Sequence, residues 1–219
     1  MSEKMLVTQA LDERDLMVKK IGDKISKMKL VDMKKRNEER TADSRVTPEE
    51  FGSTASAAYQ SIMDLIDRFQ RIDAAIVASN AASTVKTSYG EFTVAGAIAL
   101  RNRLKGNGIY DADGAFETRL TAQLERQYQA AVQTVEYKNK SLESQAETMR
   151  LSILGKDSKV KDTKPLEVVD AYIRENTTEV IDPLESQKKV QELKEKVDTL
   201  LTELDTQIKV SNATTMIEF

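Results

Sequence analysis

Residues 62–83 read IMDLIDRFQRIDAAIVASNAAS, and this stretch decides the fold. Its apolar residues step by three and four positions: Ile62, Leu65, Phe69, Ile72 and Ile76. Such spacing puts them on one stripe of a helix and is typical of the seam between packed antiparallel or coiled helices. A helix of this kind cannot be stable alone, so we expect it to bury the stripe against other helices.

A second copy of this stretch follows 132 positions later. Residues 194–215 read KEKVDTLLTELDTQIKVSNATT, with the seam as Val197, Leu201, Leu204 and Ile208. A weaker echo relates ALDERD at 10–15 to AIALRN at 97–102, which is 87 positions further on. The chain is therefore interpreted as a duplication, with halves of roughly 1–90 and 91–219. Because the two offsets differ, we place an insertion in the second half, near 143–183.

The composition favours an almost wholly helical chain. With 5% aromatic residues, eight Gly and three Pro, turn signals are sparse. We expect helices over 3–33, 48–81, 94–105, 116–154, 165–174 and 183–210, with Thr47 and Thr93 as N-caps, a turn at 86–91 and a surface loop at 155–164. The predicted fold class is all-α: a single domain, 1–219, forming an antiparallel four-helix-type bundle from two duplicated helical hairpins. The insertion adds a helical arm that either serves oligomerisation or merely lengthens the bundle.

The residues that are missing exclude several classes of function. The chain has no Cys and no His, which removes disulfides, thiolate nucleophiles, Cys-rich zinc sites and the usual near-neutral proton shuttle. No phosphate-binding loop, dinucleotide fingerprint or catalytic triad occurs in the sequence. We therefore expect no enzyme, no cofactor and no metal site.

Charge and hydropathy restrict the partners. A net charge of −3 and a pI near 5.3 argue against binding of duplex nucleic acid. The lysine-rich positions between 24 and 36 are interrupted by acidic residues and are interpreted as a solvated face. No window approaches the roughly 18 apolar residues of a membrane span, and residues 1–6 lack the apolar core of a signal peptide. We expect a soluble, cytoplasmic protein with no membrane partner.

The candidate site lies where the two seam helices end. Small hydrogen-bonding residues recur there in both copies: Ser79, Asn80, Ser83 and Thr84 in the first, and Ser211, Asn212, Thr214 and Thr215 in the second. One interpretation is structural: each Asn ends its helix in the left-handed conformation, and the hydroxyls satisfy carbonyls left free at the helix end. The other is functional: these donors line a pocket for a phosphate or a carboxylate.

Basic residues would supply positive charge to such a pocket. They are Arg14, Arg101, Arg103 and Lys105. Arg14 and Arg101 are equivalent in the two copies, and guanidinium groups suit planar phosphate and carboxylate recognition. The alternative is that these side chains form ordinary ion pairs. The equivalent Asp73 and Asp205 are interpreted as the partners that hold the two arginines, rather than as ligands of a divalent cation.

Two strings resemble the septicolysin-like family of small helical proteins. They are ALDERDL at 10–16 and SNAAST at 79–84, joined by amphipathic helices. The resemblance implies an all-helical, non-membrane fold whose biochemistry is poorly defined. The second copy departs from the family's pattern, since Glu13 corresponds to Leu100 and Asp15 to Asn102.

Two hypotheses of function follow. The first is a non-enzymatic, homo-oligomeric helical protein that binds and sequesters a small anionic ligand, phosphate-bearing and nucleotide-like, at the helix ends. The alternative is a structural or adaptor protein, such as a virion or assembly component, that acts through protein–protein contacts. Repetition of the Ser-Asn pair and of the arginine favours the first hypothesis, because a packing motif needs to repeat only its apolar residues.

Overall fold

The computed structural model describes residues 3–107, 112–154 and 164–219. Long helices account for most of these residues, and the strands have three or four residues each, so the all-α prediction is confirmed. The chain divides into two compact units. The first unit consists of residues 1–102 and 200–219, and the second of residues 103–199. Within the described residues, no helix is both long and apolar enough to cross a membrane.

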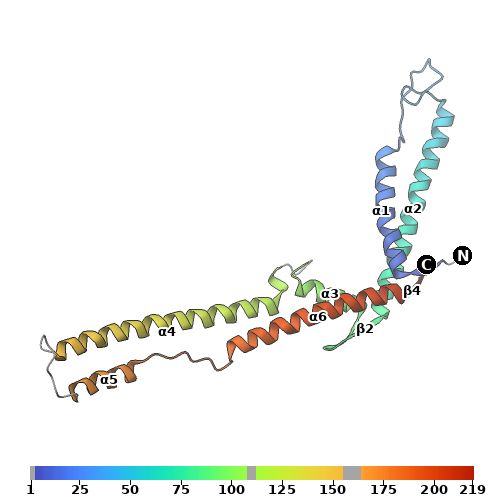
Figure 1. Cartoon of the computed structure of the whole chain (residues 1–219). Coiled ribbons are helices and arrows are strands. Elements are labelled where there is room, and N and C mark those ends of the chain that lie inside the picture. Colours follow the sequence, from blue (N-terminus) through green and yellow to red (C-terminus); the bar gives the residue numbers. More distant parts are fainter. Residues whose placement is uncertain (1–2, 108–111, 155–163) are drawn as a thin grey trace. The chain divides into compact units, whose positions relative to one another are not determined.

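The first unit is built around an antiparallel pair of helices, α1 (Val7–Lys27) and α2 (Pro48–Ala82). Figure 1 shows α1 lying beside the longer α2. The unit also contains most of α3 (Val94–Leu104) and the C-terminal part of α6 (Ser186–Thr214). Four short strands join these helices: β1 (Lys4–Leu6), β2 (Thr84–Thr87), β3 (Gly90–Thr93) and β4 (Met216–Glu218).

The sequence predicted neither the strands nor the way in which they pair. The strand that follows α2 pairs with the strand that precedes α3, and the strand that follows α6 pairs with the strand that precedes α1. Both pairs are antiparallel, with Thr84 opposite Thr93 and Met216 opposite Leu6. The predicted turn at 86–91 is confirmed at Ser88 and Tyr89. It is the tight turn of a β-hairpin in which Gly90 adopts a φ of 141°.

A hydrophobic core lies between α1, α2 and β4. Its buried members are Val7, Ala10, Met17, Ile72, Ile76 and Ile217. Each of these residues has a repeat equivalent 87 or 132 positions away, and that equivalent is also buried. The equivalent pairs are Val7 and Val94, Ala10 and Ala97, Met17 and Leu104, Ile72 and Leu204, Ile76 and Ile208, and Val85 and Ile217. The apolar repeat in the sequence therefore corresponds to a repeat in burial.

Helix starts agree with the predicted caps where a side chain accepts the free N–H. Thr47 Oγ1 accepts from the Glu50 backbone at 3.2 Å, and the Glu50 carboxylate accepts from the Thr47 N–H at 3.0 Å. Thr93 Oγ1 likewise accepts from Gly96 at 3.0 Å. The prediction for the first helix is wrong at both ends, because residues 4–6 form a strand and the helix ends at Lys27.

The last helix also begins later than predicted, at Ser186 rather than near Pro183. The Asp182 carboxylate accepts hydrogen bonds from the Ser186 backbone at 2.7 Å and from its hydroxyl at 2.8 Å. Glu185 adopts a φ of 52°, a left-handed conformation that a helix cannot contain. The Asp-Pro signal therefore marks a turn whose acidic residue caps the helix from four positions away.

The second unit contains α4 (Phe116–Leu154), α5 (Lys164–Asn176) and the N-terminal part of α6. A short 3-10 turn, η2 (Ala112–Gly114), precedes α4. Arg150 contacts Asp170 at 2.9 Å and so joins α4 to α5, as Figure 1 also shows. Asn139 exchanges two hydrogen bonds of 2.9 Å with the backbone of Thr178. The predicted helix at 116–154 is confirmed, whereas residues 155–163 of the predicted loop lie outside the described residues.

Candidate functional site

The two predicted helix-end motifs occupy equivalent places, but neither Asn ends its helix. Helix α2 continues past Asn80 to Ala82, and α6 continues past Asn212 to Thr214. Among the described residues, the only non-glycine residues with positive φ are Arg45 and Glu185. The prediction of a left-handed Asn is therefore wrong. Each helix instead ends because the next residue is extended and leads directly into a strand, as the φ of −80° and ψ of 143° at Ser83 show.

Backbone hydrogen bonds give these motifs a structural role. The Ser83 N–H donates to the Ser79 carbonyl at 2.8 Å, and the Thr215 N–H donates to the Ser211 carbonyl at 2.9 Å. The carbonyl of Ser83 then accepts from the Val94 N–H, and the carbonyl of Thr215 accepts from the Val7 N–H, both at 2.9 Å. Each motif thus joins the end of one helix to the start of another helix from the opposite half of the sequence.

The side chains of these motifs differ in their partners. Thr214 Oγ1 donates to the Val210 carbonyl at 2.9 Å, which satisfies a carbonyl near the helix end, as the structural interpretation predicted. Thr84 is exposed on β2, and Ser211 and Thr215 are half-buried. Asn80 and Asn212 are both half-buried, and neither side chain forms a hydrogen bond within the part of the chain that the structure describes.

The equivalent arginines are held by the equivalent aspartates. Arg14 Nη1 lies 3.2 Å from Asp73 Oδ1, and Arg101 Nη1 lies 3.3 Å from Asp205 Oδ1. All four side chains are partly exposed. The predicted ion pairs are therefore confirmed. Each arginine contacts a carboxylate of the helix beside it, so part of its charge is already neutralised within the fold.

Arg103 belongs to a separate ion pair in the second unit. Its guanidinium forms two hydrogen bonds of 2.8 Å with the Glu117 carboxylate and lies 5.2 Å from the centre of the Phe116 ring. The hydrogen bonds from Arg103 lower the pKa of Glu117 from its ordinary value of 4.5, although partial burial opposes the shift. Lys105 is exposed just beyond α3. The structure thus ties Arg103 to the start of α4 rather than to a helix-end motif.

Arg68 forms the densest ionic contact, and the sequence did not predict it. Its guanidinium donates to Glu13 at 2.7 Å and to both oxygens of Glu3 at 2.7 and 2.9 Å, and it lies 5.4 Å from the centre of the Phe219 ring. The hydrogen bond from Arg68 lowers the pKa of Glu3, and its two carboxylate partners raise the pKa of Arg68.

One signal in the sequence could have revealed this contact. The counterparts of Arg68 and Glu13 in the second half are Leu200 and Leu100, so both partners of an ion pair become leucine together. A paired change of this kind between two copies indicates that the residues are neighbours.

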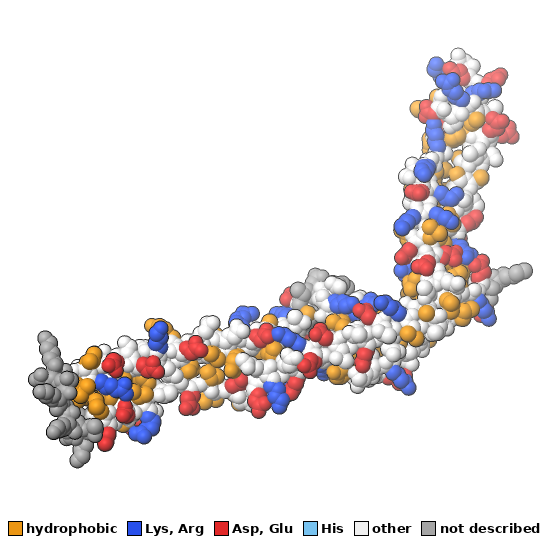
Figure 2. Space-filling view, in the orientation of Figure 1, with side chains coloured by type: hydrophobic (Ala, Val, Ile, Leu, Met, Phe, Trp, Pro, Cys, Tyr) orange, Lys and Arg blue, Asp and Glu red, His pale blue; other side chains and the backbone are white. Residues whose placement is uncertain are grey.

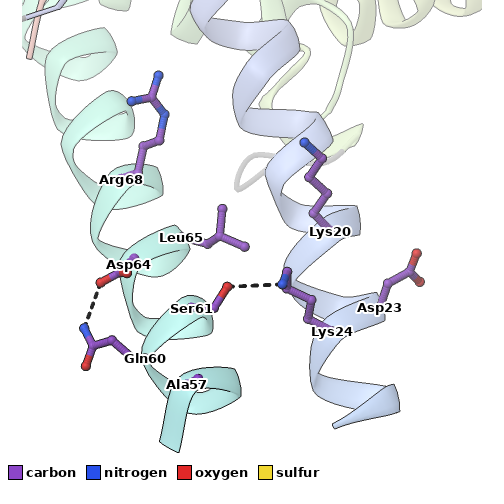
Figure 3. Close-up of a pocket in the computed structure, with 9 residues that line it drawn as sticks. All are labelled: Lys20, Asp23, Lys24, Ala57, Gln60, Ser61, Asp64, Leu65 and Arg68. Carbon is purple, nitrogen blue, oxygen red and sulfur yellow. Dashed lines mark hydrogen bonds between the residues drawn. The ribbon is translucent and has the colours of Figure 1, made fainter. Parts of the chain in front are cut away.

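A groove of about 780 Å³ runs along one side of the α1 and α2 pair (Figure 3). Lys24 Nζ donates across it to Ser61 Oγ at 3.1 Å, and Gln60 donates to Asp64 along α2 at 2.8 Å. The groove carries charges of both signs, since acidic and basic side chains alternate along its rims. It is lined by Lys20, Asp23, Lys24, Ala57, Gln60, Ser61, Asp64, Leu65 and Arg68. None of the predicted site residues lies in this groove.

The loop between α1 and α2 is organised by one carboxylate. The Asp32 side chain is 0% exposed. It accepts backbone hydrogen bonds from Met33 at 2.7 Å, Asp43 at 3.3 Å and Ser44 at 2.8 Å. Burial by itself would raise the pKa of Asp32, but the hydrogen bonds hold it well below the ordinary value of 3.8.

No group of three or more acidic side chains that could hold a metal ion occurs among residues 3–107, 112–154 and 164–219. No family model, no curated protein and no solved structure matches the chain. The resemblance to the septicolysin-like family therefore stays a prediction, and the site must be judged from its own geometry.

Proposed function

We propose that the chain is a non-catalytic structural or adaptor protein that acts through protein–protein contacts. One observation carries this proposal: the α1 and α2 pair leaves large apolar side chains uncovered, among them Val18, Ile25, Tyr59 and Val77. Figure 2 shows hydrophobic side chains along this pair between the charged ones. Apolar surface of this kind marks protein interaction sites more often than sites for small anions.

The engagement of the arginines also supports the proposal. An anion that bound at Arg14 or Arg101 would have to compete with Asp73 or Asp205, which lie within 3.3 Å. Arg103 is held by two hydrogen bonds to Glu117. A ligand would have to displace these carboxylates, or bind beside them against their negative charge.

Photo-crosslinking in the cell that makes the protein tests the proposal. A photoreactive amino acid at Tyr59 should yield protein adducts, because this side chain is exposed beside other uncovered apolar groups. Gln191 is the matched control, since it stands 132 positions later at the equivalent place and is polar. If Tyr59 and Gln191 yield the same absence of adducts, the proposal fails.

Sequestration of a small anion is the second candidate, and the two asparagines favour it. Asn80 and Asn212 are equivalent and half-buried, and their amides form no hydrogen bond within the described residues. A thermal-shift screen with nucleotides separates the candidates, because a ligand at 100 times its Kd adds about 2.7 kcal/mol to the stability of the native state. We expect no shift at millimolar nucleotide. A clear rise in Tm that the Asn80→Ala and Asn212→Ala variants lose would establish sequestration instead.

A further inference from the structure

One flank of the α1 and α2 pair carries an apolar stripe. On α1 it consists of Leu11, Val18 and Ile25, which stand seven residues apart. Seven residues turn a helix through almost two full turns, so these side chains lie on one face. Val18 is 56% exposed and Ile25 is 48% exposed. Leu11 also packs against the edge of the core, whereas Val18 and Ile25 lie outside the buried seam, which is the pattern of a helix that packs on two sides.

Helix α2 carries the matching half of the stripe. Tyr59 and Ile66 stand seven residues apart, and Val77 stands eleven residues beyond Ile66, which again keeps one face. Tyr59 is 54% exposed and Val77 is 61% exposed. The three residues of α2 thus repeat along the helix much as those of α1 do.

Two contacts between the helices show that both halves lie on the same flank and at the same levels. Arg14 lies between Leu11 and Val18 on α1, and its partner Asp73 lies between Ile66 and Val77 on α2. Together with the Lys24 to Ser61 hydrogen bond, this ion pair fixes the antiparallel register. This register puts Leu11 level with Val77, Val18 level with Ile66, and Ile25 level with Tyr59. We call these three levels the apolar flank.

The second half of the chain shows that the helix equivalent to α2 does not require apolar side chains at these positions. The counterparts of Val18 and Ile66 are Lys105 and Asp198, and those of Tyr59 and Val77 are Gln191 and Lys209. Leu11 has the apolar counterpart Ile98, and Ile25 corresponds to Ala112, which lies beyond the end of α3. Helix α6 therefore forms with polar side chains at the positions of Tyr59, Ile66 and Val77, whereas Lys105 lies just beyond the end of α3. The apolar side chains of α2 at these positions are thus free to serve another contact.

We propose, resting on the protein–protein role above, that the apolar flank binds the same flank of a second copy of this chain. The two hairpins lie parallel, so that α1 of one copy faces α2 of the other and the four helices form a bundle. This arrangement brings each level against the same level of the second copy. It also brings Arg14 against Asp73 of the second copy, so this ion pair of the flank is complementary to itself.

The rim of the flank and its area fit this occupant. Gly22, Met63 and Gln70 border the three levels and carry no charge, whereas Asp15, which borders the first two levels on α1, pairs with Arg14 of its own copy at 3.4 Å. The stripe spans 14 residues of α1, or about 21 Å, and a pair of helices is about 20 Å wide. With its ends included, each copy would cover on the order of 600 Å², which gives a total of about 1,200 Å² at the lower limit for a specific dimer.

Sedimentation of the full chain over a range of concentrations tests the proposal. We expect a dimer that dissociates on dilution. The Val18→Lys, Ile66→Asp double variant adopts the residue types of the second half, so it should fold with unchanged helicity and be a monomer. Leu16→Lys is the matched control, because Leu16 is exposed to a similar extent on the other flank of α1 and its loss should leave the dimer intact.

Cysteine crosslinking tests the arrangement, because the chain has no Cys of its own. Oxidation of a mixture of the Val18→Cys chain and the Ile66→Cys chain should yield mainly the mixed disulfide, since α1 faces α2 of the other copy. Homodimers of the Val18→Cys chain would show that α1 faces α1 and would overturn the parallel arrangement.

Failure of this proposal can be told from failure of the proposed function. A chain that stays a monomer at every concentration, but whose Tyr59 crosslinks to a different protein, overturns self-association and leaves the adaptor role. A monomer whose Tyr59 crosslinks to nothing overturns both. A dimer that survives the Val18→Lys, Ile66→Asp change places the interface elsewhere and also overturns the proposal.

Discussion

Asp32 shows how one side chain can organise a loop of some twenty residues between α1 and α2. Its carboxylate is enclosed and accepts hydrogen bonds from three backbone N–H groups, two of them eleven and twelve positions further on. An acidic residue in a charged linker gives no sign of this in the sequence. The loop is therefore ordered by hydrogen bonds to one buried charge rather than by an apolar core.

We predict that Asp32 titrates well below 3.8, because the charged form accepts these hydrogen bonds and the protonated form loses some of them. A lowered pKa in the folded state means that Asp32 stabilises the loop above its ordinary pKa. This contribution is lost as the pH falls through the lower folded-state value. NMR titration of the carboxyl carbon of Asp32 measures it. An ordinary midpoint at Asp32 would contradict the hydrogen-bonded loop.

The two equivalent ion pairs permit an internally controlled measurement. We predict coupling energies of about 0.3–1 kcal/mol for Arg14 with Asp73 and for Arg101 with Asp205, because all four side chains are partly exposed. Double-mutant cycles with alanine, read by urea unfolding, give both values. Coupling near zero in both cycles would free the arginines for another role and would revive the anion site.

At the scale of elements, the strands matter more than their length suggests. Ile217 of β4 is 5% exposed and belongs to the core of α1 and α2, so a three-residue strand closes that core. Its neighbour Met216 points to solvent. The side chains of this strand alternate between core and water, as its period requires.

We predict that Ile217→Ala destabilises the first unit by about 2–4 kcal/mol, since it removes buried methyl groups where α1, α2 and β4 meet. Met216→Ala is the control on the same strand and should change stability by less than about 0.5 kcal/mol. Thermal or urea unfolding followed by circular dichroism measures both. Equal effects would show that the strand contributes only backbone hydrogen bonds.

The helices could be predicted from the sequence because their apolar period runs over many turns. The seam around Ile72 and its copy around Leu204 placed α2 and α6, and repetition of arginine and aspartate placed two ion pairs. The strands could not be predicted, because β2 and β4 each have one buried residue, Val85 or Ile217, within three or four positions and so show no period. The Arg68 contact was missed since it depends on β1 bringing Glu3 to α2.

At the scale of the molecule, the second unit contains a segment whose ends meet. Asn139 and the backbone of Thr178 exchange two hydrogen bonds, so the segment 140–177, which includes the last turns of α4 and the whole of α5, begins and ends at the same place. Most of the insertion that the unequal repeats predicted lies within this range. Contacts between the start of α4 and α6, such as that of Lys194 with Glu125, do not involve this segment.

We predict that a chain in which a short Gly-Ser linker replaces residues 140–177 still folds. The first unit contains none of the deleted residues, and the start of α4 keeps its contact with α6. Circular dichroism should show helix loss in proportion to the residues removed, with cooperative unfolding retained. Loss of the cooperative transition would show that the segment is part of the folding core.

In the first unit, the β2–β3 pair links the end of α2 to the start of α3, and the β4–β1 pair links the end of α6 to the start of α1. The residues of β1 bond to those of β4 as β3 bonds to β2, except that a two-residue turn joins β2 to β3 and no peptide bond joins β4 to β1. Either strand pair is therefore a suitable place for the two ends of the chain.

A circular permutant that links Phe219 to Glu3 through a short Gly-rich linker and begins at Tyr89 should reach the same fold. Its new ends lie beside the contact of Ser88 with Glu203 and the hydrogen bond from the Tyr89 N–H to Thr87. Retention of the parent's circular dichroism and of its cooperative unfolding would establish that the two strand pairs, and not the position of the chain ends, specify the structure.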